Sequence, residues 1–297
     1  MTDRIDPPAD VPTPSVHVVT DSSCDLPSDI AHDLGISIVP LTIRFGDEEF
    51  IDREELSTAE FWTHCVNSDT LPETAAPAPG QFEQSFRSAA AKGATGIVVI
   101  SLSSALSATV QSAQLAARAI ADDPTIVVDV RVVDSRTISM GLGTIALACA
   151  RAARDGAGID EIEAIAIDLV GRTRVYGALD TLENLKKGGR IGNAKALLAT
   201  ALSIKPIIEV TGGVVEQAGQ QRTRSKALAH LVGTVRGFQG KIENLAVLHA
   251  DCSDVDLFVE MLAPYHTDEI VIGEIGPVIG THSGRGTIGV AFQVTTP

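Results

Sequence analysis

The segment Gly280-Thr281-His282-Ser283-Gly284-Arg285-Gly286 combines residue types that can bind an anion. Its histidine lies between two hydroxyl side chains, and three glycines surround them. Glycine lets the backbone approach a ligand closely, and an imidazole can donate to or accept from a carboxyl or phosphate group near neutral pH. Strand-like runs at 269–272 and 288–292 flank the segment, so we interpret it as an anion-binding loop. A simple surface hydrogen bond is the alternative role for His282.

A second hydroxyl-rich segment, residues 101–109, follows the apolar run 97–100 and is predicted to open a helix. Ligands of open α/β sheets bind beyond the carboxyl ends of the strands. Helix N-termini attract anions through free N–H groups and a partial positive charge. The four serines and one threonine of this segment are therefore candidates for binding a carboxylate or phosphate. Helix capping, which needs only one hydroxyl, is the alternative.

Two further candidates lie on predicted turns. Thr74 belongs to the proline-rich loop 70–79, which could hold one hydroxyl over a pocket or lie at the surface. Arg190 follows Gly188 and Gly189, and such a turn can present a guanidinium to a carboxylate or phosphate. The alternative for this turn is a C-capped helix with basic residues in its last turn.

The basic cluster 221–226 stands out in an acidic chain. We predict that Arg222 and Arg224 face a partner, and a solvated helix start is the alternative. The formal net charge of −15 disfavours unassisted binding to nucleic acids or anionic membranes.

Several other chemistries lack support in the sequence. The Gly-x-Gly-x-x-Ala match at 141–146 begins six residues after its strand, so close helix packing explains it better than dinucleotide binding. We find no nucleophile elbow and no cysteine or histidine pair with metal-ligand spacing. We also find no apolar run of the roughly 18–20 residues that a membrane helix needs. We expect a cytoplasmic protein with reduced cysteines, no metal and no cofactor.

Short apolar runs alternate with helical periodicity along the chain, which indicates α/β architecture with parallel strands. The second half includes a predicted hairpin over 205–217. Residues 1–14 are proline-rich and form a predicted disordered tail. We place an N-terminal domain at 15–170 and a C-terminal domain at 171–297, and a return of the final strands to the first sheet stays open.

The motifs occur in a characteristic order. They are Thr-Asp-Ser after the first strand, a threonine loop with proline, Ser-Ser-x-Leu-Ser-x-Thr, Asp-Ser at 134–135, Leu-x-x-Leu-Lys-Lys-Gly-Gly-Arg-Ile and Gly-Thr-His-Ser-Gly-x-Gly. Together, from about Val16 to Phe292, they resemble the DegV family of bacterial fatty-acid-binding proteins. The sequence departs from the usual family pattern at Ala75, Ala76, Ala108, Val110 and Arg285.

The resemblance implies two α/β domains, each with a mainly parallel sheet flanked by helices, and an apolar fatty-acid tunnel in or beside the N-terminal domain. It implies that Thr74, Ser104, His282 and Arg190 hold the carboxylate, with Ser103 and Thr281 as additional candidates.

The resemblance further implies a carrier rather than an enzyme. Such a carrier presents the carboxyl group of a long-chain fatty acid to a separate ATP-dependent fatty acid kinase. Two alternatives remain open. One is a stand-alone phosphotransferase or hydrolase that acts on a small carboxylated or phosphorylated ligand, and the other is a regulatory protein that senses a lipid or metabolite.

Overall fold

The computed structural model describes residues 15–68, 70–199 and 204–295, and they form a layered α/β protein. Within these ranges the strands form three sheets, with orders β2-β1-β6-β7, β10-β9-β8-β13-β11-β12 and β4-β3-β5. The strands are β1 Val16–Asp21, β2 Ser37–Val39, β3 Thr42–Phe45, β4 Glu48–Ile51, β5 Glu73–Ala75, β6 Gly96–Ser101, β7 Asp129–Asp134, β8 Thr173–Ala178, β9 Lys205–Thr211, β10 Val214–Gln221, β11 Ile242–His249, β12 Val271–Glu274 and β13 Ile288–Val294.

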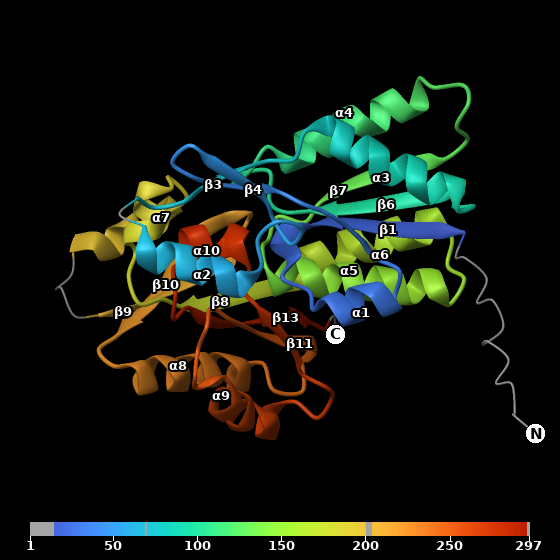
Figure 1. Ribbon diagram of the computed structural model, residues 1–297. Coiled ribbons are helices and arrows are strands. Elements are labelled where there is room, and N and C mark those ends of the chain that lie inside the picture. The colour runs from blue at the N-terminus through green and yellow to red at the C-terminus, as the bar shows by residue number, and fades with distance from the viewer. Residues whose placement is uncertain (1–14, 69, 200–203, 296–297) are drawn as a thin grey trace, which may run out of the picture.

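Helices cover both outer faces of the two larger sheets and also fill the space between them (Figure 1). Helices α3 and α4 cover the four-stranded sheet, α5 and α6 lie between the sheets, and α8 and α9 cover the six-stranded sheet. The α-helices are α1 Ser28–Asp33, α2 Thr58–Asn67, α3 Pro79–Ala91, α4 Thr109–Ala121, α5 Met140–Arg154, α6 Ile159–Arg172, α7 Glu183–Lys187, α8 Arg224–Gly237, α9 Val255–Leu262 and α10 Pro277–Ser283. Among the described residues, no helix combines the length and apolar character that crossing a membrane would require.

The four-stranded sheet is parallel throughout, as predicted. Every residue of β6 is buried, because helices cover both faces of the sheet. Small residues let α5 approach its neighbours. A Cβ atom at Gly143 would lie 2.7 Å from the carbonyl oxygen of Cys24. The glycine-rich run at 141–146 therefore serves helix packing, as the sequence indicates.

The prediction of a mainly parallel second sheet is wrong. Four of its five strand pairings are antiparallel, and only β11 and β12 run parallel. The predicted hairpin is present, and its turn at Gly212 and Gly213 has φ angles of 61° and 89°. A turn this short can join only antiparallel strands. The final strand, β13, lies between β8 and β11 and does not return to the first sheet.

Two predicted segments differ in ways that affect the site. The glycine-rich segment around His282 is mostly helical, because Pro277 starts α10 and Gly284, with φ 79°, ends it. Helix α4 begins only at Thr109, so Ser104 lies in the preceding turn rather than at a helix N-terminus.

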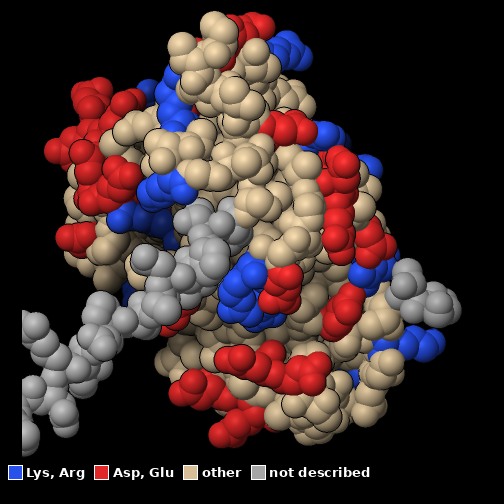
Figure 2. All heavy atoms as spheres, turned by 90° about the vertical axis from the view of Figure 1, so that its right-hand side faces the viewer, with Lys and Arg blue, Asp and Glu red and all other residues tan. Residues whose placement is uncertain are grey.

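Charged side chains of both signs share the molecular surface. On the face in Figure 2, acidic side chains are spread widely and basic side chains lie among them. This distribution agrees with the net negative charge of the sequence.

Candidate functional site

Thr74 and His282, which are 208 positions apart in the sequence, meet in the structure. The Oγ1 atom of Thr74 lies 3.0 Å from Nε2 of His282. Thr74 is carried by β5, which pairs with β3 so that Thr74 lies opposite Ile43. His282 lies in the last turn of α10. The three-stranded sheet and α10 therefore place a hydroxyl and an imidazole side by side.

This pair borders a cavity of about 180 Å³ that has mainly apolar walls. The walls come from both halves of the chain, including β9, β10 and α10. The apolar lining residues are Leu41, Ala76, Leu102, Leu106, Ala108, Ile138, Leu185, Ile208, Val215, Val278 and Ile279. The polar lining residues are Thr74, Ser107, Arg190, His282 and Ser283.

The electrostatics of His282 favour a neutral imidazole. Burial lowers its pKa to about 4, and the positive charge of Arg190 acts in the same direction. The Nδ1 atom is buried and has no hydrogen-bond partner in the described structure. A Cβ atom at Gly188 would lie 2.4 Å from Nδ1, so the ring fits only because residue 188 has no side chain.

Arg190 supplies positive charge to the site. Its Nε donates to the carbonyl oxygen of Leu106 at 3.2 Å, and its Nη1 donates to that of Gly188 at 2.6 Å. Within the described ranges Arg190 forms no ion pair with a carboxylate. Since guanidinium groups pair well with carboxylates, this arrangement can attract an anion.

Ser104, Ser103 and Thr281 do not line this cavity. Ser104 is exposed, and its hydroxyl donates to Asp134 at 2.5 Å. Ser103 is buried and donates to the carbonyl oxygen of Gly213 at 2.7 Å. Thr281 donates to the carbonyl oxygen of Pro277 at 2.8 Å, inside its own helix.

Ser107 lines the cavity in place of Ser104, and its hydroxyl oxygen lies 2.8 Å from that of Thr109. Ser107 and Ser283 belong to the two hydroxyl-rich segments that the sequence indicates, but the sequence interpretation did not single them out as lining residues. The motif Ser-Ser-x-Leu-Ser-x-Thr contains Ser107, but only the start of α4 decides which serine faces inward.

The other arginines considered in the sequence differ in their exposure and in their contacts. Arg222 is exposed. Arg224 instead forms a two-pronged pair with Asp254, with distances of 2.9 and 2.8 Å, and also donates to the Gly286 carbonyl oxygen. Arg224 is therefore engaged within the protein rather than free for a partner. Arg285 pairs with Asp251 at 2.7 Å.

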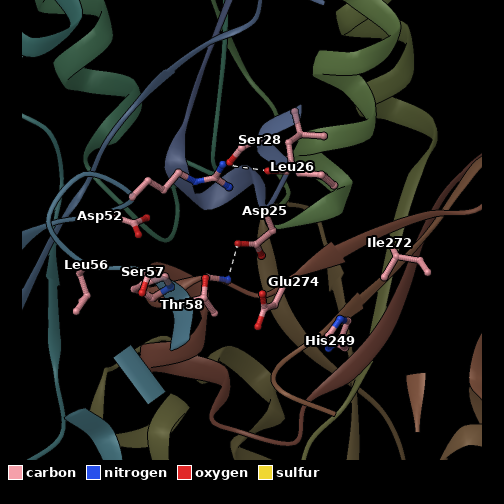
Figure 3. A pocket seen from close by; sticks show the side chains of 14 residues that line it. Asp25, Leu26, Ser28, Asp52, Leu56, Ser57, Thr58, His249, Ile272 and Glu274 are labelled. Carbon is pink, nitrogen blue, oxygen red and sulfur yellow. Dashed lines mark hydrogen bonds between the residues drawn. The ribbon is translucent and has the colours of Figure 1, made fainter. Parts of the chain in front are cut away.

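A second, more polar cavity of about 420 Å³ lies at the other end of α10 (Figure 3). Its lining includes Asp25, Asp52, Arg53, His249 and Glu274. Among the described residues, no group of three or more histidine, cysteine or acidic side chains is arranged to hold a metal ion.

The layered sheets define an α/β protein, and anion-attracting groups border its apolar cavity. The family model described as "Uncharacterised protein, DegV family" matches residues 15–295. The chain therefore belongs to the DegV family, and the resemblance seen in the sequence is confirmed.

Relatives match over nearly their whole length. A DegV domain-containing protein of Streptomyces coelicolor is 36% identical over 293 residues, which cover 94% of this chain and 98% of the relative. One of Deinococcus radiodurans is 32% identical, with the same coverage of both chains.

Solved structures share the fold. A DegV family protein from Thermus thermophilus, described by its fatty acid binding, matches with a TM-score of 0.86 at 32% identity, covering 94% of this chain and 99% of that one. DegV of Bacillus subtilis, described as a fatty acid binding protein, matches with a TM-score of 0.84 at 27% identity and the same coverage.

Proposed function

We propose that this chain binds a fatty acid, with the hydrocarbon tail in the apolar cavity and the carboxylate beside Thr74, His282 and Arg190. The observation that carries the proposal is the 3.0 Å contact between Thr74 and His282 at the cavity lined by apolar side chains. The fatty acid binding described for two similar structures supports it.

The expected energetics suit such a ligand. Each buried methylene contributes about 0.8 kcal/mol, so the gain before ordering costs grows with the number of methylenes that the cavity takes up. The head group then needs few polar contacts, mainly to set the orientation of the chain. A carboxylate beside His282 would favour the protonated imidazole, so binding would take up a proton where the free histidine is neutral.

We further propose that the protein is a carrier rather than an enzyme, and that a separate ATP-dependent fatty acid kinase acts on the bound carboxyl group. Thr74, His282 and Arg190 are suited to holding a carboxylate. Arg222, which is exposed, remains the proposed partner-facing residue, whereas the internal contacts of Arg224 argue against that role for it.

Native mass spectrometry with palmitate tests fatty acid binding. We expect the wild-type protein to retain one palmitate. Thr74→Val and His282→Ala should each weaken binding by roughly ten- to a hundredfold, because each removes a buried polar contact to the carboxylate.

Ser104→Ala is the matched control, because it also removes a hydroxyl near the strand ends but lies outside the cavity. Its affinity for palmitate should stay within about threefold of wild type. A wild-type chain that never carries palmitate would rule out the proposal. Turnover of a carboxylated or phosphorylated ligand without added kinase would contradict the carrier role.

A further inference from the structure

A buried turn connects the first strand to the walls of the apolar cavity. It comprises residues 21–25, here called the Asp21–Asp25 turn, and every residue in it is at most 1% exposed. None of its residues lines the apolar cavity. Asp25, at its end, has a left-handed backbone with φ 53°. Buried polar side chains need hydrogen-bond partners, and in this turn the partners belong to segments that build the cavity.

Two of these contacts hold cavity-lining backbone directly. The Ser22 hydroxyl oxygen accepts from the N–H of Leu41 at 3.0 Å. The Asp21 carboxylate accepts from the N–H of Leu102 at 2.9 Å. Leu41 and Leu102 both line the apolar cavity, so the turn fixes two of its walls.

A third contact fixes the start of α5. The carbonyl oxygen of Ser23 accepts from the N–H of Ser139 at 3.0 Å. Ser139 directly follows Ile138, which lines the cavity. The turn therefore also sets the position of this third wall.

Asp25 makes the contact that bears on the head group. Its Oδ1 accepts from the N–H of Gly276 at 2.9 Å, and its Oδ2 accepts from the Ser139 hydroxyl at 2.5 Å (Figure 3 shows the first of these). Gly276 is the residue that precedes α10, and His282 lies in the last turn of that helix.

We propose that Asp25 is the positioning residue of the head-group site, because it fixes the start of α10 and so aligns His282 with Thr74. This inference rests on the proposed fatty acid binding and adds a residue that does not touch the ligand. A helix of seven residues is too short to be stable by itself, so its placement depends on tertiary contacts. Displacements of about 1 Å are enough to impair a polar site.

The experiment compares affinities for palmitate and hexadecanol, which share a tail but differ in the head group. Asp25→Gly removes the carboxylate, and glycine accepts the left-handed backbone without strain. We expect palmitate affinity to fall at least tenfold and hexadecanol affinity to change less than threefold. The preference for palmitate is the ratio of the affinities for palmitate and hexadecanol. Asp25→Asn should keep most of the wild-type preference, because its amide can still accept from Gly276 and donate to Ser139.

Ser139→Gly is the control, because it removes the hydroxyl contact of Asp25 while leaving the contact with Gly276. Its preference for palmitate should stay within threefold of wild type. If Asp25→Gly does not fold, Gly276→Ala disturbs the same contact, since a Cβ there would lie 3.3 Å from Oδ1 of Asp25. It should lower the preference for palmitate likewise.

The outcomes separate the two proposals. Equal palmitate preference in wild type and Asp25→Gly, or equal losses for both ligands, would overturn the role of Asp25 and leave fatty acid binding intact. Wild-type protein that binds neither ligand would overturn both.

Discussion

At the scale of single residues, the candidate site depends on the polar side chains at the cavity and also on a glycine that leaves space for one of them. Thr74, His282 and Arg190 are suggested by motif order, and the structure brings them to one cavity. Ser104 could not be rejected from sequence, because the choice between it and Ser107 depends on the residue at which α4 begins. The sequence indicates a turn at Gly188 but not the contact of that residue with His282, since only the folded chain places the two together.

Gly188→Ala should weaken palmitate binding by roughly tenfold, because the new methyl group would force the His282 ring out of line with Thr74. The backbone of Gly188 has φ −72°, which alanine adopts freely, so the fold should be retained. Native mass spectrometry gives the affinity. Gly80→Ala, whose Cβ would meet nothing within 4 Å, should leave binding unchanged.

At the scale of elements, sequence periodicity predicts most helices and strands, including the parallel first sheet. It does not predict strand direction in the second sheet, because direction depends on which strands become neighbours. The chain between β8 and β9 contains α7 yet returns antiparallel. The helical character of residues 277–283 was hidden by Gly280 and by the glycines that follow at 284 and 286, although Pro277 and Gly284 mark the ends of the helix.

Gly143→Ala should destabilise the protein by about 1–3 kcal/mol, even though alanine favours helices by up to about 1 kcal/mol over glycine. The reason is that its Cβ would meet the Cys24 carbonyl oxygen, which belongs to backbone. Urea denaturation measures the effect. Gly171→Ala in α6 has open space and should instead be neutral or stabilising; equal effects of both substitutions would contradict the packing argument.

At the scale of the whole molecule, buried carboxyl groups link stability to pH. Burial raises the pKa of Asp25 to about 7 and that of Asp52 to about 6. Arg53 lowers the pKa of both, and Glu274 and His249 line the same cavity. The folded state binds the protons of Asp25 and Asp52 more tightly than the unfolded state does. Protonation of these two groups therefore adds to the free energy of unfolding at low pH. This contribution is lost as the pH rises from about 4 to about 7.

Asp25→Asn should therefore remove part of this pH dependence. Relative to wild type, the variant should gain stability as the pH rises from 5 to 8, by an amount on the order of a few kcal/mol. Urea denaturation at each pH measures the difference. Asp123→Asn is the control, because its neighbours lower the pKa of Asp123 to about 2 and it stays ionised throughout. Parallel stability curves for wild type and Asp25→Asn would contradict the prediction.

The layer formed by α5 and α6 also bears on how such a chain can be divided. Helix α5 packs against β1 and β6 of one sheet and against β8, β11 and β13 of the other. If the chain were cut after α6, the N-terminal fragment would expose the apolar side of α5 and α6 that packs on the six-stranded sheet. The C-terminal fragment would expose the face of that sheet which these helices cover. Large bare apolar surfaces promote aggregation. A chimera of two related chains would therefore need α5, α6 and the sheet strands that pack on them to come from the same parent.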